Sequence, residues 1–427
     1  MPIDDHPLRY TLVNELHARP FPSLDVPCTA VYVAIKETGN SAGRDRAADR
    51  AHLTALLDRH GAGHPPPGAT HFAATLGRHD LKWESHTEFV TYSAFAKGVS
   101  DRPFDPRDAE VFPADWLGEA PGKRIAAILV RVEPMPEDRA AITAKLDDWF
   151  VGESLACSAV VDETAVIAGD FQIDPSGQMR FAVFIRPGTG QRRVGRIVQR
   201  LCEIETYRAM SMLGLGRARE LGARLNAIDP KLSALVQTMT DDRTAADAEL
   251  HDLLSISAEL ESLAVRHSFR FGATGAYEAI VNQRIEVLRE VRFEGRQTFG
   301  EFMMRRYDPA MRTVKSAERR LEQMATRAER AGELLRTRVD VERSAQNQKL
   351  LESMDQRADL QLRLQKTVEG LSIVAISYYA FQLLRYVIEP IAEALWEVPY
   401  YAVDVVLVPL VVAAVWLVLR RIRRGWE

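Results

Sequence analysis

The chain has 427 residues, of which 46% are hydrophobic, and carries a formal net charge of −4. At ~100–200 residues per domain, this length predicts two or three units with a sizeable core. Because the charge is nearly balanced, it gives no general attraction to nucleic acid, and no nucleic-acid partner is expected. The three cysteines are widely spaced and form no CxxC pair, which excludes a disulfide framework and fits a reducing cytoplasm.

Residues 1–190 show strand-like and helix-like runs in turn, which predicts a cytoplasmic α/β domain with a mostly antiparallel sheet. Strands are predicted at Val26–Lys36, His71–Leu76, Lys82–Phe89, Thr91–Ala96, Arg124–Val132, Cys157–Ile167 and Met179–Ile185. Helices are predicted at Arg44–Arg59 and Glu137–Phe150. Since the first residues hold neither a basic start nor an apolar stretch, we expect no secretory signal.

Residues 191–307 are predicted to form a helical layer, because apolar residues recur there at helical spacing. The predicted helices are a long one from Arg192 and further ones at Pro230–Met239, Asp247–Leu263 and Glu278–Phe293. The glycine-rich segment Gly188–Gly195 precedes this layer. It fits either an ordinary joint between sheet and helices or an anion site at a helix N-terminus.

A very long helix is predicted to begin at Asp308, since Asp is a good N-cap and Pro309 suits the first helical position. The next proline is Pro390, so the stalk over 308–366 should continue into a first membrane span, on the order of 100 Å in all. Apolar residues with coiled-coil-like spacing follow it: Val314, Leu321, Met324, Ala328, Ala331, Leu335, Val339, Leu350, Met354, Leu364 and Val368. This stripe fits either packing against the chain's own domain or a self-associating stalk.

Two apolar runs near the end of the chain, over 367–388 and 402–419, each approach the ~20 residues with which a helix crosses a bilayer. The connecting loop 389–401 is acidic and the tail 420–427 is basic. The charged residues are Glu389, Glu393 and Glu397 in the loop and Arg420, Arg421, Arg423 and Arg424 in the tail. By the positive-inside rule, we expect a two-span inner (plasma) membrane protein with both termini cytoplasmic and an outer (periplasmic) loop.

The polar residues of the first span fall on one helical face, which Ala375 completes: Ser372, Ala375, Tyr379, Gln382 and Tyr386. Such a face is expensive in lipid and should turn toward protein or water. It fits either hydrogen bonding to the second span or the lining of a pore at the axis of a homo-oligomer. Arg385 lies near the outer end of this span, where it can snorkel to the interface. Asp404, at the start of the second span, is its candidate ion-pair partner.

The charged ends of this hairpin have two interpretations each. The arginine tail fits either membrane topology with attraction to anionic lipid, or a basic ring around the mouth of a pore. The acidic loop fits either an entrance that concentrates cations or a plain soluble cap.

A polar face is predicted on the strand Lys82–Phe89, where alternation places Glu84, His86 and Glu88 on one side. Two flanking carboxylates would favour the protonated form of the imidazole. The face fits either a structural role or a ligand-binding or catalytic site. We find no convincing catalytic, nucleotide-binding or metal-ligand motif, so the sequence predicts no enzyme and identifies no metal or cofactor.

Three segments resemble a bacterial family of membrane-anchored proteins, the domain-of-unknown-function family numbered 3422. They are Asn14–Pro20, Lys82–Phe89 and Val368–Tyr379. The resemblance covers nearly the whole chain and implies no activity.

The order of the predicted elements resembles the CorA-type metal-ion transporters, in which five subunits surround a pore lined by the first span. The tail Arg420–Trp426 is similar to the basic, tryptophan-containing end of that family. Where that family has a Gly-Met-Asn selectivity motif, this chain has Leu384–Glu389, so the resemblance implies no magnesium selectivity.

The leading hypothesis from the sequence is a CorA-like homo-oligomer of the inner membrane that passes ions along an axis lined by the first span. The alternative is a non-conducting membrane anchor that presents a sensor or scaffold domain in the cytoplasm.

Overall fold

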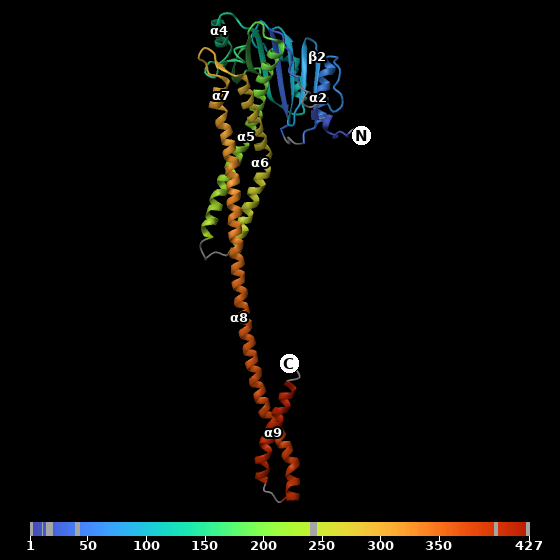
Figure 1. Cartoon of the computed structure of the whole chain (residues 1–427), viewed down its shortest axis with the longest axis vertical. Helices are drawn as coiled ribbons and strands as arrows, with labels where there is room; N and C mark the ends of the chain where they lie inside the picture. The colour runs from blue at the N-terminus through green and yellow to red at the C-terminus, as the bar shows by residue number, and fades with distance from the viewer. Residues whose placement is uncertain are drawn as a thin grey trace. The chain divides into compact units, whose positions relative to one another are not determined.

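A computed structural model describes residues 3–10, 12–13, 20–38, 43–239, 246–396 and 400–423 (Figure 1). The chain divides into two compact units. The first comprises Met1–Arg243 and His251–Ala331, and the second comprises Thr244–Leu250 and Gly332–Glu427. The fold is α+β with a long helix, as the sequence predicts, and the predicted mostly antiparallel sheet is a mixed sheet.

Nine strands of the described residues form one sheet in the first unit, in the order β2-β3-β4-β1-β5-β8-β7-β6-β9. They are β1 (Cys28–Lys36), β2 (His71–Leu76), β3 (His79–Ser85), β4 (Phe89–Lys97), β5 (Lys123–Pro134), β6 (Ala156–Val160), β7 (Ala165–Ile173), β8 (Met179–Ile185) and β9 (Val291–Arg292). Strands β5 and β8 pair in parallel, and the other described pairs are antiparallel. Strand β1 is central and buried throughout, which suits the apolar run Ala30–Ile35 within it.

The predicted strand Cys157–Ile167 is wrong, because the structure has a hairpin there, formed by β6 and β7. The turn holds Val161, Asp162 and Glu163 at φ values of 51°, 58° and 54°. Non-glycine residues with positive φ are uncommon, and the turn signal in the sequence was limited to the polar residues Asp162, Glu163 and Thr164, without glycine, proline or asparagine.

Short helices cover one face of the sheet and enclose the main hydrophobic core. They are α2 (Arg46–Arg59), η1 (Pro106–Val111), α3 (Ala114–Gly118) and α4 (Arg139–Trp149). The alternation of β1 sends Val31, Val33 and Ile35 into this core. Tyr32 points to the opposite face, where it accepts a hydrogen bond from Thr206. The long helix α5 (Gln191–Thr238) covers that opposite face, packed on β1, β5 and β8.

The helical layer of the first unit is completed by α6 (Ala246–Leu288) from His251 onward, α7 (Phe299–Arg306) and the first part of α8 (Asp308–Trp396). Close contacts join them to α5. A Cβ at Gly214 would lie 2.3 Å from the Thr274 hydroxyl, so glycine lets α5 and α6 approach. Arg320 of α8 donates to Asp229 of α5 at 3.0 Å.

Two predicted breaks in the helical layer are wrong. Helix α5 continues through Pro230, since buried Ile228 and Leu232 carry its packed face across the proline. Such packing offsets the ~3 kcal/mol that a proline costs inside a helix. The two helices predicted within 247–293 are one helix, α6, which ends at Leu288.

The segment Gly188–Gly195 joins strand β8 to helix α5, as the first of its two interpretations predicts, and the anion site stays a prediction. Helix α5 begins at Gln191, and a Cβ at Gly195 would lie 1.7 Å from the Pro22 carbonyl oxygen. Glycine is therefore required for the segment around Pro22 to pack on α5.

The long helix predicted from Asp308 is confirmed, and α8 runs to Trp396 with Pro390 inside it. The predicted loop over 389–401 is therefore helical as far as Trp396, and helix α9 (Tyr400–Arg423) begins at Tyr400. Pro390 does not end α8, although a proline inside a helix removes one backbone hydrogen bond. Among the described residues, α8 is the one helix long and apolar enough to cross a membrane, and α9 holds a shorter apolar stretch, Asp404–Val418.

The apolar stripe of α8 has two parts. Val314 and Leu321 are buried in the first unit, and Leu335 and Val339 are buried in the second. Packing against the chain's own helices therefore explains this part. Farther along, the remaining members of the stripe are more than half exposed, and these are Leu350, Met354, Leu364 and Val368.

Candidate functional site

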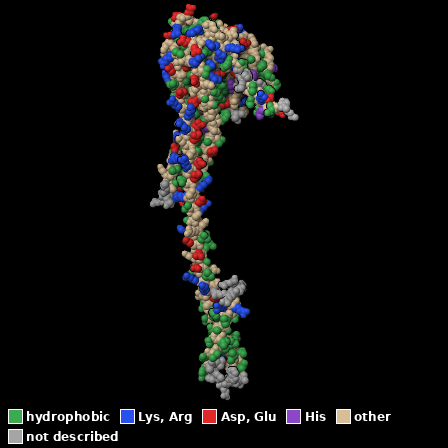
Figure 2. Space-filling model, viewed as in Figure 1, with side chains coloured by type: hydrophobic (Ala, Val, Ile, Leu, Met, Phe, Trp, Pro, Cys, Tyr) green, Lys and Arg blue, Asp and Glu red, His purple; other side chains and the backbone are tan. Residues whose placement is uncertain are grey.

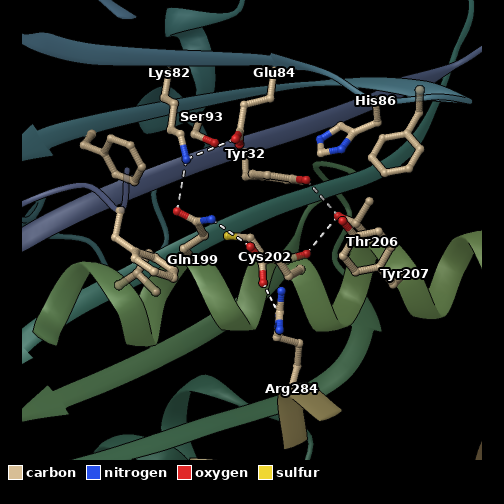
Figure 3. Close-up of a pocket in the computed structure, with 15 residues that line it drawn as sticks. Tyr32, Lys82, Glu84, His86, Ser93, Gln199, Cys202, Thr206, Tyr207 and Arg284 are labelled. Carbon is tan, nitrogen blue, oxygen red and sulfur yellow. Dashed lines mark hydrogen bonds and ion pairs between the residues drawn. The ribbon is translucent and has the colours of Figure 1, made fainter. Parts of the chain in front are cut away.

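A cavity of about 250 Å³ lies in the first unit between the sheet and helix α5 (Figure 3). Strands β1, β3 and β4 form one wall, α5 forms the other, and Arg284 of α6 reaches in from the side. The lining residues are Phe21, Tyr32, Lys82, Glu84, His86, Phe89, Ser93, Phe95, Val198, Gln199, Cys202, Glu203, Thr206, Tyr207 and Arg284. At this cavity the sheet face under α5 carries the polar side chains of Lys82, Glu84 and Ser93 beside aromatic rings.

A chain of polar contacts crosses the cavity. The Lys82 Nζ lies 3.2 Å from Glu84 Oε1 and donates to Gln199 Oε1 at 3.2 Å. The Gln199 Nε2 donates to Glu203 Oε1 at 2.7 Å, and Arg284 donates to the other oxygen of Glu203. Figure 3 shows Lys82 reaching Gln199 from the strand side, with Arg284 on the other side of helix α5's polar groups. Two cations and two carboxylates are therefore connected through one amide.

The far end of the cavity is neutral. Thr206 donates to the Tyr32 hydroxyl at 3.1 Å, and burial raises the pKa of Tyr32 well above its usual value. Burial also raises the pKa of the Cys202 thiol, with a further contribution from Glu203. A thiol is a poor nucleophile, so Cys202 is not placed for covalent chemistry. No group of three metal-ligating side chains occurs among the described residues.

The predicted polar strand face is wrong beyond Ser85. Strand β3 ends there, and His86 and Glu88 lie in the turn to β4, because a turn interrupts the alternation that the sequence implied. Glu84 and His86 both line the cavity, whereas Glu88 turns away from it. The His86 ring stacks on Phe89 at 4.4 Å between centroids. His86 and Glu88 therefore do not share a strand face with Glu84.

Glu88 is buried, with 1% of its surface exposed, and it connects the turn to helix α6. It accepts a hydrogen bond from Tyr277 at 3.0 Å and pairs with the Arg270 guanidinium. Its role is to hold the β3–β4 turn against the helical layer, next to the cavity.

Sequence reasoning missed the helical side of the cavity. Gln199, Glu203 and Thr206 are spaced by four and three residues, which places polar groups on the face of α5 that packs on the sheet. This spacing could have indicated a polar site between α5 and the sheet. Arg284 lies 81 residues beyond Glu203, and nothing local to it indicates the contact.

In the second unit, α9 covers one side of α8. Ser377 of α8 and Val411 of α9 are buried at this contact, with 6% and 3% of their surfaces exposed. Tyr379 and Tyr386, from the predicted polar face, are 68% and 77% exposed. At about 100° per residue, that face lies roughly opposite Ser377. Helix α9 therefore leaves most of the predicted polar face uncovered.

Individual polar groups of the first span bond within their own helix. Ser372 donates to the Val368 carbonyl at 2.8 Å, and Gln382 donates to the Tyr378 hydroxyl at 3.2 Å. Ser372 and Gln382 are partly covered, whereas Ala375 is exposed.

Arg385 lies close to two carboxylates near the turn of the hairpin. Arg385 Nε lies 3.8 Å from Asp404 Oδ1, and Arg385 Nη2 lies 3.7 Å from Glu389 Oε1. In the tail, the Arg420 guanidinium lies 4.9 Å from the centre of the Trp416 ring. Arg421 is exposed. The side chains of Glu393 and Arg423, and the residues Glu397 and Arg424, lie outside what the structure describes.

A family profile described as "Protein of unknown function (DUF3422)" matches residues 4–426 of the chain. The chain belongs to this family. No curated protein matches it. Membership extends over both units, and it assigns no chemistry to the cavity or the hairpin of this DUF3422 protein.

Proposed function

We propose that this DUF3422 protein is a two-span homo-oligomer of the inner membrane whose first spans surround an axis that passes ions. In this proposal the spans are 367–388 and 402–419, both termini are cytoplasmic, and the first unit lies in the cytoplasm. The apolar surface of α8 and α9 supports a bilayer partner (Figure 2). The acidic connector and the arginine tail support the orientation.

The observation that carries the assembly is the polar face of α8 that α9 leaves uncovered. Tyr379 and Tyr386 are mostly exposed, and they lie opposite the side that packs on α9. Polar side chains that face lipid are unfavourable, so this side of α8 calls for protein or water. Copies of the same helix around an axis would provide both, with Ala375 and Gln382 between the two tyrosines.

Cross-linking and flux measurements test the proposal together. The variant Tyr379→Cys should form disulfide-linked dimers in membranes on mild oxidation, because the polar faces of α8 from neighbouring subunits would be in contact. The natural cysteines are buried and should not interfere. Val406→Cys is the matched control, because Val406 is 64% exposed on the side of α9 away from α8.

Purified protein in liposomes should then conduct ions above the level of empty vesicles. A monomer on sizing, with no cross-link at position 379 and no flux, would refute the assembly.

The contact between Arg385 and Asp404 favours a second candidate function, a non-conducting membrane anchor that presents a sensor or scaffold domain. An ion pair within one hairpin would seal the two helices together without any partner subunit. Asp404→Asn should then lower the thermal stability of the purified protein in detergent. An oligomer that passes ions and keeps its stability after this substitution would argue for the first proposal instead.

A further inference from the structure

The cavity in the first unit carries charges of both signs in equal number. Lys82 and Glu84 lie on its strand wall, and Glu203 and Arg284 lie on its helical wall. The side chains of Lys82, Glu84 and Glu203 are 13%, 11% and 18% exposed, so these charges are largely withdrawn from water. A site of this kind suits a ligand that also carries both charges and no net charge.

A core is less stable when charged side chains surround a cavity than when apolar side chains fill the space. A buried ion pair is often no more stabilising than apolar side chains of the same volume. Interiors are otherwise close-packed, with few voids larger than a water molecule. The opposite face of the same sheet follows that rule, with Val31, Val33 and Ile35 in a continuous apolar core. The polar cavity is therefore better explained by binding than by stability.

Aromatic rings supply the remaining surface of the cavity. Phe21, Phe89, Phe95 and Tyr207 line it beside the charged groups. Its volume of about 250 Å³ is below the ~300–1,000 Å³ of sites for drug-sized ligands. A small molecule with an apolar portion fits these walls, and a polymer or a large cofactor does not.

We propose that this cavity binds a small zwitterion of the α-amino acid type with an apolar side chain. The ligand carboxylate contacts Lys82, whose ammonium has three donors and can keep its two present partners. The ligand ammonium contacts Glu203, and the apolar side chain packs on the aromatic rings. This site is separate from the proposed membrane assembly and holds whether or not the chain passes ions.

Three probes of nearly equal shape separate the charge requirements. They are L-phenylalanine, 3-phenylpropionate, which lacks the ammonium, and phenethylamine, which lacks the carboxylate. Calorimetric titration of the full-length protein in detergent should show saturable binding of phenylalanine and binding at least about tenfold weaker for either analogue. L-Leucine and L-glutamine extend the panel to aliphatic and polar side chains. Phenylalanine should also raise the melting temperature in proportion to the logarithm of its concentration.

Substitutions in the cavity test the assignment of each charge. Lys82→Met should weaken phenylalanine binding by at least about tenfold and leave phenethylamine binding nearly unchanged. Glu203→Gln should also weaken phenylalanine binding by at least about tenfold, but it should leave the binding of 3-phenylpropionate nearly unchanged. Lys97→Met is the matched control, since Lys97 is 85% exposed and pairs with Asp25 outside the cavity.

Three outcomes would overturn the proposal. One is that neither phenylalanine nor leucine saturates below about 10 mM, or that glutamine binds as tightly as either. Another is that the singly charged analogues bind as tightly as phenylalanine. The third is that the Lys82→Met protein binds phenylalanine as the wild type does. Where a variant does not fold, the comparison of the three probes on the wild-type protein decides.

Discussion

Replacing Glu88 by glutamine should lower the stability of the first unit far more than the loss of an exposed carboxylate does. Glu88 is buried, and it receives Arg270 and the Tyr277 hydroxyl at one point of contact between a strand turn and helix α6. The substitution keeps the size of the side chain and one carbonyl acceptor. It removes the charge that balances the Arg270 guanidinium, whose side chain is only 12% exposed.

Breaking a buried ion pair by removing one partner costs about 3–5 kcal/mol. Because glutamine can still accept from Tyr277, we expect a loss near the lower end, about 3 kcal/mol. Such a loss is a large share of the ~5–15 kcal/mol that typically stabilises a native protein. Glu220→Gln is the control, since Glu220 pairs with Arg217 on an exposed part of α5. That substitution should cost less than about 1 kcal/mol.

Urea unfolding of the full-length protein in detergent measures both effects, because Trp83 and Trp116 are fully buried in the first unit and report its unfolding by fluorescence. A double-mutant cycle with Tyr277→Phe separates the hydrogen bond from the ion pair. If Glu88→Gln and Glu220→Gln lower stability equally, the turn is not held by this buried contact and the reasoning fails.

Three further predictions concern other parts of the first unit. Gly195→Ala should cost more than about 2 kcal/mol in urea unfolding, because its Cβ would overlap the Pro22 carbonyl, whereas Gly216→Ala, with nothing within 4 Å, should be neutral or stabilising. Burial opposes the charged form of Glu133, but hydrogen bonds from a lysine and an arginine outweigh it and lower the carboxyl pKa below 4.5. A lowered carboxyl pKa adds stability above pH 4.5 that is lost as pH falls through the folded value, so Glu133→Gln should flatten the acid limb of the stability curve. Burial raises the pKa of Cys28 to about 12, so iodoacetamide at pH 8 should alkylate it only after unfolding, as peptide mass spectrometry can show.

Local patterns were sufficient for those parts of the fold that local physics determines. The bounds of β8 were predicted without error, because Met179–Ile185 is a short apolar run that begins just after a turn. The start of α8 was predicted from one N-cap and one proline. The hairpin of β6 and β7 and the turn at His86 were not predicted, since both turns lack the glycine or asparagine that usually marks a turn.

The cavity could be predicted only in part, because it is built from three regions far apart in the sequence. Glu84 was predicted as part of a polar strand face with His86 and Glu88, but those two residues lie in a turn. Its actual partner is Lys82, two residues away on the same face of β3. The pairing of Glu203 with Arg284 depends on how α5 and α6 pack, and packing of this kind leaves no local pattern.

The exposed stretch of α8 connects sequence, stability and the proposed assembly. From Leu350 to Val368 the helix has little burial, and its large apolar side chains are 55–66% exposed. Isolated helices in water gain little from propensity alone, and most helices in proteins are stabilised by packing of an apolar face. Leu350, Met354, Leu364 and Val368 recur with a spacing that drifts toward eleven residues, and they offer such a face to a second copy of the chain. Self-association would therefore stabilise this stretch of α8. The same contact between copies of α8 would cover the polar face of the first span.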